Sequence, residues 1–421
     1  MWKLLRVLFI SVLILCSYYS FSFAAWPTGP NTKMLLAALG LVWFLFDSWR
    51  QGKGLPFTPL MIGGAIFAGV YSIINLVAVE VNATDDYSYV NYLTTFFVWI
   101  FSIYPAMAML RLEYGQITFT RVAYYLAGVS AFQCISALLI DNIPEVDEWV
   151  TSLVYYEAEF MERIDRLRCF STSLDMGGVR FALVLILIAG CLSIDRELRA
   201  NTPHVVYLLV SFFIILSVGS MVSRTTFAGA AVGILIYIIQ TSFGAVRREV
   251  SPSKIMPIFM SITLLMVGIG VYLYNTDPYY YELIRFAFEG FFNLAEKGEF
   301  TTSSTEVLNS MWLWPKDTQS WIIGTGVYGH YVYGTDIGYC RLILYSGLTG
   351  FIPFALSFVF YAYVLGTRYS PYRWMFLAFC AMTFIIWVKV STDILMIYAF
   401  MFWLRPEDDT LIFKQAQSQA L

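Results

Sequence analysis

Residues 205–222 read VVYLLVSFFIILSVGSMV, an apolar run without a single charged side chain. A helix needs about 20 predominantly apolar residues to cross the hydrocarbon core of a bilayer, and this run approaches that length. Similar apolar runs begin near Gly178 and Phe227, and only short polar links separate the three. The stretch therefore predicts consecutive membrane-spanning helices.

The same pattern recurs along the whole chain. Of its 421 residues, 59% are hydrophobic and only 13% are charged, whereas a soluble domain carries about 25% charged residues. We therefore predict an all-α polytopic membrane protein with about twelve transmembrane helices, and we expect residues 1–421 to form a single integral membrane domain. The predicted spans begin near Leu4, Leu35, Thr58, Tyr92, Arg121, Gly178, Val205, Phe227, Pro257, Leu342, Arg373 and Asp393.

The first and last predicted spans each leave an alternative open. The span near Leu4 follows a basic N-terminus and precedes residues 22–24 (SFA), a pattern that also fits a cleaved signal peptide. Its apolar run is long for a signal peptide, so we expect a retained helix. The span near Asp393 is short, and residues 390–393 (VSTD) before it are alternatively a break within one helix.

The basic residues indicate the orientation, because Lys and Arg in short loops remain in the cytoplasm. With the N-terminus inside, every cytoplasmic link is basic, whereas the short opposite links are mostly acidic or neutral, as in residues 80–86 (EVNATDD). Both termini are therefore predicted to be cytoplasmic. The basic residues assigned to this side are Lys3, Arg6, Arg50, Lys53, Arg111, Arg121, Arg196, Arg199, Arg247, Arg248, Lys254, Arg368, Arg373, Arg405 and Lys414.

Two long loops lie on the external side, near residues 141–177 and 276–340. Long loops in a compact bundle are usually functional or disordered, and the many Tyr, Trp and Phe residues of these two argue against disorder. We expect their aromatic segments to rest on the membrane surface. Cys169 and Cys340 are the external cysteines, and the sequence leaves open whether they pair.

Arginines on the external side are informative because the positive-inside bias disfavours them there. A guanidinium offers planar, bidentate donors that suit phosphate oxygens, so several of them predict a polyanion site. The alternative is that each arginine pairs with a nearby acid or reaches the lipid headgroups. These external arginines are Arg163, Arg166, Arg168, Arg180, Arg224, Arg285 and Arg341.

Three further stretches carry the motifs of a known family. They are residues 166–178 (RLRCFSTSLDMGG), residues 223–226 (SRTT) at the start of a span, and residues 323–326 (IGTG) followed by 335–341 (TDIGYCR) and 347–350 (GLTG). In order and topology they resemble the O-antigen polymerase and O-antigen ligase group of GT-C-like membrane glycosyltransferases. The first stretch has Leu174-Asp175 where that family has Pro-Asn, which leaves open whether Arg166 or Arg168 takes the family's arginine position.

Polymerases and ligases of this group differ at the end of the large loop, where ligases carry a His before an Asn-rich helix start. The helix start here, residues 335–339 (TDIGY), is similar to the polymerase form. His330 is then interpreted as a loop-packing residue, with a ligase-like catalytic role as the alternative.

The resemblance implies polymerisation of undecaprenyl-diphosphate-linked oligosaccharide repeats into O-antigen or a related surface polysaccharide. The reaction would take place on the periplasmic face of the bacterial inner membrane. Fixed guanidiniums would neutralise the charge that develops on the leaving diphosphate. The implied substrate-binding residues are Arg166, Arg168, Arg224, Arg285 and Arg341.

Deprotonation of the acceptor hydroxyl requires a carboxylate or a His. Asp336 and Asp175 lie nearest to the motifs and are the catalytic candidates, although Asp336 is equally well placed to cap a helix. The other external candidates are Glu157, Glu159, Glu162 and Asp165. The spacing of Asp, Glu and His indicates no metal site, and we expect no cofactor.

The implied partners, besides the undecaprenyl-diphosphate-linked oligosaccharides, are a chain-length regulator and a flippase in the inner membrane; no nucleic-acid partner is expected. An O-antigen ligase, a flippase for lipid-linked oligosaccharide and a secondary transporter are the alternatives. A flippase would carry charges within its central spans, and this chain has few. A transporter would show broken helices near the middle of the membrane.

Overall fold

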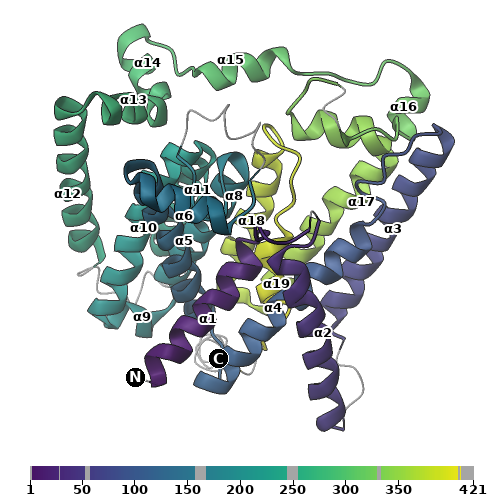
Figure 1. Ribbon diagram of the computed structural model, residues 1–421, viewed down its shortest axis with the longest axis horizontal. Coiled ribbons are helices and arrows are strands. Elements are labelled where there is room, and N and C mark those ends of the chain that lie inside the picture. The colour runs from purple at the N-terminus through teal and green to yellow at the C-terminus, as the bar shows by residue number, and fades with distance from the viewer. Residues whose placement is uncertain are drawn as a thin grey trace. The chain divides into compact units, whose positions relative to one another are not determined.

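The computed structural model describes residues 2–27, 29–52, 57–156, 167–243, 255–329, 333–405 and 408 (Figure 1). Helices dominate this part of the chain, and its only β-type contact is an isolated antiparallel bridge between Phe23 and Val154. Eight of the described helices are long and apolar enough to cross a membrane. The chain is therefore an all-α polytopic membrane protein, as predicted.

The order of the elements follows the predicted spans, because a described helix begins within a few residues of each predicted start. The elements are α1 (Trp2–Tyr18), α2 (Thr32–Arg50), α3 (Pro59–Val81), α4 (Tyr92–Tyr114), α5 (Phe119–Asn142), α6 (Pro144–Leu153), α8 (Leu174–Ile194), α9 (Arg196–Ala200), α10 (Thr202–Val222), α11 (Thr225–Phe243), α12 (Ile255–Thr276), α13 (Pro278–Ala287), α14 (Glu289–Lys297), α15 (Ser303–Ser310), α16 (Thr318–Ile322), α17 (Gly338–Arg368), η3 (Ser370–Tyr372), α18 (Arg373–Ile386) and α19 (Leu395–Met401).

The last predicted span is interrupted. α18 ends at Ile386 and α19, which has only 7 residues, starts at Leu395. At about 1.5 Å per residue, α19 alone is much shorter than the roughly 30 Å hydrocarbon core. Residues 387–394 thus separate α18 from α19. Whether the two helices form one interrupted span or two spans, and the total of about twelve spans, stay predictions.

Contacts divide the chain into two compact units, which we describe separately. Unit 1 contains Met1–Leu35, Ala106–Phe300 and Leu404–Leu421, and unit 2 contains Leu36–Pro105 and Thr301–Trp403. The expectation of one integral membrane domain stays a prediction.

The helix α8 forms the centre of unit 1, where every residue from Gly177 to Ile194 is buried. It packs most extensively against α11. Gly229 makes this approach possible, because a Cβ atom there would lie 2.2 Å from the Cα of Ala182. Small residues at such an interface let the backbones of two membrane helices come close together.

The helix α1 is an integral part of unit 1. Its Ile10 and Ile14 are fully buried, and its last residue forms a reciprocal contact with α8. The Tyr18 hydroxyl donates to the carbonyl of Arg180 (3.0 Å), while Nε of Arg180 donates to the carbonyl of Tyr18 (2.8 Å). Whether the protein retains this helix stays a prediction.

Unit 1 separates the two predicted sets of basic residues. Thr120 at the start of α5 donates to Asp195, which follows α8, and this end carries α9 with Arg196 and Arg199. The start of α8 lies at the other end, beside the last turn of α1, and carries Arg180. The arginines that the topology assigns to opposite sides thus lie at opposite ends of unit 1.

In unit 2, α17 packs against α3 and α18, and it is kinked at Gly347 (φ 63°, ψ −175°). Residues 322–326 pack into the kink, where the amide N–H of Thr325 donates to Leu344 (2.7 Å) and that of Gly326 to Tyr345 (3.0 Å). Carbonyls that the kink releases from the helix therefore find partners. A Cβ on Gly347 would lie 2.2 Å from the carbonyl oxygen of Ile322, so only glycine fits there.

Candidate functional site

Two of the sequence motifs meet in unit 1. The first turns of α8, which end the RLRCFSTSLDMGG motif, contact the SRTT segment at the start of α11. A Cβ atom on Gly178 would lie 2.6 Å from Cβ of Ser223 and 3.2 Å from that of Thr225. The Ser223 hydroxyl donates to the carboxylate of Asp175 (3.0 Å). One catalytic candidate, Asp175, is thereby placed directly beside the segment that carries Arg224.

Arg224 links this contact to the second long loop. Its Nε donates to the carbonyl of Phe286 (3.0 Å), its guanidinium forms an ion pair with Glu289, and it lies 4.1 Å from the centre of the Phe286 ring. The Arg224 side chain is only 15% exposed. Charge and ring contacts thus hold the start of α11 against α13 and α14.

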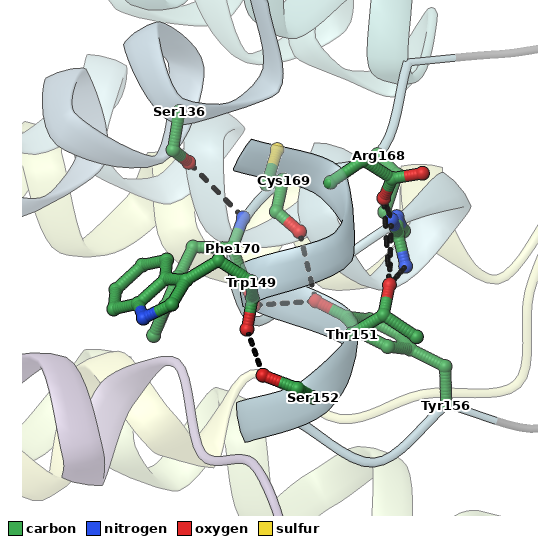
Figure 2. Close-up of polar contacts among 9 residues, drawn as sticks. Ser136, Trp149, Thr151, Ser152, Tyr156, Arg168, Cys169 and Phe170 are labelled. Carbon is green, nitrogen blue, oxygen red and sulfur yellow. Dashed lines mark hydrogen bonds and ion pairs between the residues drawn. The ribbon is translucent and has the colours of Figure 1, made fainter. Parts of the chain in front are cut away.

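Arg168 in the first long loop makes the same kinds of contact as Arg224. Figure 2 shows its side chain beside Thr151 and Tyr156. Its guanidinium is buried, forms an ion pair with Asp147 of α6, lies 3.4 Å from the Thr151 hydroxyl and 4.4 Å from the centre of the Tyr156 ring. Burial lowers the pKa of this guanidinium. The next residues are fixed to α5, because the amide of Phe170 donates to the Ser136 hydroxyl (3.0 Å).

Two further arginines lie in unit 1. Arg285 forms a bidentate ion pair with Glu296 (2.8 and 2.9 Å), and this hydrogen bonding raises the pKa of Arg285 and lowers that of Glu296. Arg180, which was not among the predicted site residues, lies 3.4 Å from the hydroxyl of Thr172. The carbonyl of Thr172 in turn accepts from the amide of Cys169, directly after Arg168 (3.0 Å).

Four arginines of unit 1 thus each contact a neighbouring polar side chain, namely Arg168, Arg180, Arg224 and Arg285. Three of these, Arg168, Arg224 and Arg285, are predicted substrate-binding residues, and each forms an ion pair with an acidic side chain. Pairing with a nearby acid is the alternative to a polyanion site that the sequence left open. The candidates Arg166, Glu157, Glu159, Glu162 and Asp165 lie outside the described residues, as does His330.

The remaining predicted residues, Asp336 and Arg341, belong to unit 2. Asp336 is exposed, and the N-cap position of α17 falls on Ile337 without a side-chain hydrogen bond, so Asp336 does not cap the helix. Arg341 donates to the carbonyl of Tyr328 (2.8 Å) and lies 4.1 Å from the centre of its ring, instead of pairing with Asp336. Cys340 is a buried free thiol, and so is Cys169 in unit 1.

Sequence reasoning missed Asp86 of unit 2. Its carboxylate accepts hydrogen bonds from the amides of Tyr328 (2.6 Å) and Gly329 and from Ser88. Partial burial opposes ionisation, but these hydrogen bonds outweigh it and lower the pKa of Asp86. The Tyr328 hydroxyl contacts Oγ of Ser391 in the break after α18 (2.7 Å). The sequence signal for this residue is the acidic link at residues 80–86, which by itself indicates only the side of the membrane on which the link lies.

Within the described residues, no group of three or more His, Cys, Asp and Glu side chains is arranged to hold a metal ion. Comparison of the chain with protein-family models, with curated proteins and with solved structures found no match. The fold defines the class of the protein, an all-α polytopic membrane protein, and the contacts described above define two groups of polar residues within it.

Proposed function

We propose that this protein is a glycosyltransferase of the bacterial inner membrane that polymerises undecaprenyl-diphosphate-linked oligosaccharide repeats into O-antigen or a related surface polysaccharide. Its reaction takes place on the periplasmic face, and both termini lie in the cytoplasm. The observation that supports this proposal most is the contact between the RLRCFSTSLDMGG motif, which ends in the first turns of α8, and the SRTT segment, at Gly178 and Ser223. Both carry motifs that resemble the O-antigen polymerase group, and both carry arginines.

The proposed reaction moves the growing glycan from its lipid diphosphate to the incoming repeat. The bond between the anomeric carbon and the diphosphate oxygen breaks, and the lipid diphosphate leaves with the electron pair. The acceptor hydroxyl forms the new glycosidic bond and passes its proton to a carboxylate. Guanidiniums stabilise the negative charge on the leaving oxygen. Arg168 and Arg224 would supply this charge, and Asp175, which belongs to the same unit, would take the proton. Asp336 of unit 2 stays the second base that the sequence predicts.

The ion pairs of the arginines are compatible with this role. A guanidinium that already faces a carboxylate keeps a bidentate geometry that a phosphate group also fits. A diphosphate carries more negative charge than the single carboxylate of Glu289 or Asp147, so it competes well for Arg224 or Arg168. In this proposal the acids hold the side chains in place until the lipid diphosphate displaces them.

Surface polysaccharide from a strain that lacks the protein tests the function. A polymerase predicts lipid A core that carries single repeats, and wild-type protein supplied in trans restores long chains. Core without any repeats would instead indicate the ligase or the flippase alternative. Unchanged long chains in the deletion strain would contradict both.

A lipid-linked oligosaccharide flippase or transporter is the second candidate, because unit 2 contains two interrupted helices. α17 departs from helical geometry at Gly347, and α18 and α19 are separated by residues 387–394. Discontinuous helices often form substrate sites in transporters. Proteoliposomes with the substrate already on the outer face distinguish the candidates, since only a polymerase then lengthens the glycan.

A further inference from the structure

Residues 311–317 connect α15 to α16 (Figure 1). Along residues 311–314, partly buried and exposed side chains alternate. Met311 and Leu313 turn inward and pack against the buried cluster of Ile337, Cys340 and Leu344. The residues that alternate with them, Trp312 and Trp314, are exposed.

Backbone contacts fix the segment from its inner side. The amide of Leu313 donates to Sγ of Cys340 (3.3 Å), and the carbonyl of Met311 accepts from the hydroxyl of Thr335 (2.7 Å). The outward residues are Trp312 and Trp314, each 41% exposed. Two large aromatic side chains are thus presented to the outside from a backbone that is anchored behind them.

A third indole extends the pair into a row. Trp312 and Trp314 have ring centres 5.6 Å apart, and Trp314 and Trp321 have ring centres 5.9 Å apart with planes only 15° from parallel. Trp321 comes from α16, whose N-cap Asp317 accepts from the amide (2.8 Å) and the hydroxyl (2.7 Å) of Ser320. At this spacing nearly parallel rings are offset, so each leaves part of its face or edge open.

Exposed polar residues lie in the chain between the second and third tryptophans of this row. Lys316, Thr318 and Gln319 are all exposed in the turn and first residues that separate Trp314 from Trp321. A flat aromatic surface with hydrogen-bonding groups at its rim matches the two sides of a sugar, whose C–H groups stack on an aromatic face and whose hydroxyls need polar partners.

We propose that Trp312, Trp314 and Trp321 form a carbohydrate-binding platform that holds sugar rings of the glycan chain. The inference rests on the proposed function, because that function makes a glycan the substrate and product. The platform recognises the apolar faces of sugar rings and not the diphosphate, so its ligand class differs from that of the arginines of unit 1. In this proposal the platform retains the glycan chain between additions.

Binding of a glycan without turnover tests the platform. The probe is polysaccharide released from the surface of the wild-type strain by mild acid, and the protein is the full chain in nanodiscs. We expect Trp314→Ala to weaken binding about fivefold to tenfold, whereas Trp314→Phe, which keeps a ring, stays within about threefold of the wild type. Trp49→Ala removes another exposed indole of unit 2 and should leave binding unchanged.

Two outcomes would overturn the platform. One is equal binding by the wild type and Trp314→Ala. The other is quenching of fluorescence from Trp312, Trp314 and Trp321 by brominated lipids, because the row would then be a membrane-interface belt. Arg224→Ala, which should abolish polymerisation, is expected to keep glycan binding. Glycan binding therefore tests the platform, and polymerisation tests the proposed function, so the failure of one can be told from the failure of the other.

Discussion

The two units stabilise the charged side chains that the sequence assigns to the external face in different ways. In unit 1, Arg224 and Arg168 face the carboxylates of Glu289 and Asp147. In unit 2, the carboxylate of Asp86 is held largely by backbone amides, and Arg341 by a carbonyl and an aromatic ring. A carboxylate can be exchanged for another anion, whereas backbone dipoles are part of the fold. Charged residues of unit 1 should therefore affect ligand binding, whereas Asp86 should affect stability and not ligand binding.

The largest effect is expected at Arg224. Arg224→Ala should lower polymer formation by at least about 100-fold, because a fixed positive charge near the leaving group is lost. Arg224→Lys should restore little activity, since an ammonium cannot form the bidentate contact. Gel analysis of surface polysaccharide measures this, with membrane content of the protein checked by immunoblot.

Arg6→Ala is the matched control, because Arg6 also forms an ion pair with a glutamate of unit 1, Glu113, but at the other end (2.8 Å). It should leave polymer length unchanged. Normal polymer in alanine variants of Arg168, Arg224 and Arg285 together would contradict a diphosphate site in unit 1.

A smaller effect on polymerisation should distinguish Asp336 from His330 as the catalytic residue. Asp336→Asn keeps the size of the side chain and removes its charge, so a carboxylate base predicts impaired polymerisation. His330→Ala should retain most polymerisation if the His only packs within its loop. Side-by-side complementation of the deletion strain provides the comparison. Normal polymer with Asp336→Asn and none with His330→Ala would reverse the assignment in favour of a ligase-like mechanism.

The contact between the two motifs of unit 1 should appear as a stability difference between two glycines. Gly178→Ala forces a methyl group against Ser223 and should destabilise the protein by about 1–3 kcal/mol. Gly268→Ala is the control, since nothing lies within 4 Å of a Cβ atom at Gly268 in α12 and alanine favours a helix. Thermal unfolding in detergent distinguishes the variants, and equal melting temperatures would mean that the motifs do not pack as described.

Asp86 should show the smallest effect, and it depends on pH. Its folded-state pKa is depressed, so its contribution is fully present above the unfolded pKa of about 3.9 and is lost as pH falls through the folded pKa. Asp86→Asn should lower the melting temperature by about 2–4 °C at pH 7 and flatten the loss of stability below about pH 4. Identical pH profiles for the wild type and Asp86→Asn would rule out the Asp86 contact.

The sequence predicts the class of fold because apolar runs such as residues 205–222 have few alternatives in water. It also points to the break near Asp393, where polar residues interrupt an apolar pattern. The site is less predictable, since the acids that pair with Arg168 and Arg224 come from α6 and α14, and helix periodicity does not indicate which helices meet. Asp86 and Tyr328, separated by 242 positions, are joined only by tertiary structure.

Binding of undecaprenyl diphosphate without any sugar tests the role of unit 1 most directly. Native mass spectrometry of the purified protein with this lipid measures it for the wild type, for Arg168→Ala combined with Arg224→Ala, and for Arg6→Ala. We predict retained lipid in the wild type and in Arg6→Ala, and binding weakened at least about tenfold in the double variant, as expected for the loss of two charge-assisted contacts. Equal retention of the lipid by all three proteins would contradict the proposed diphosphate site.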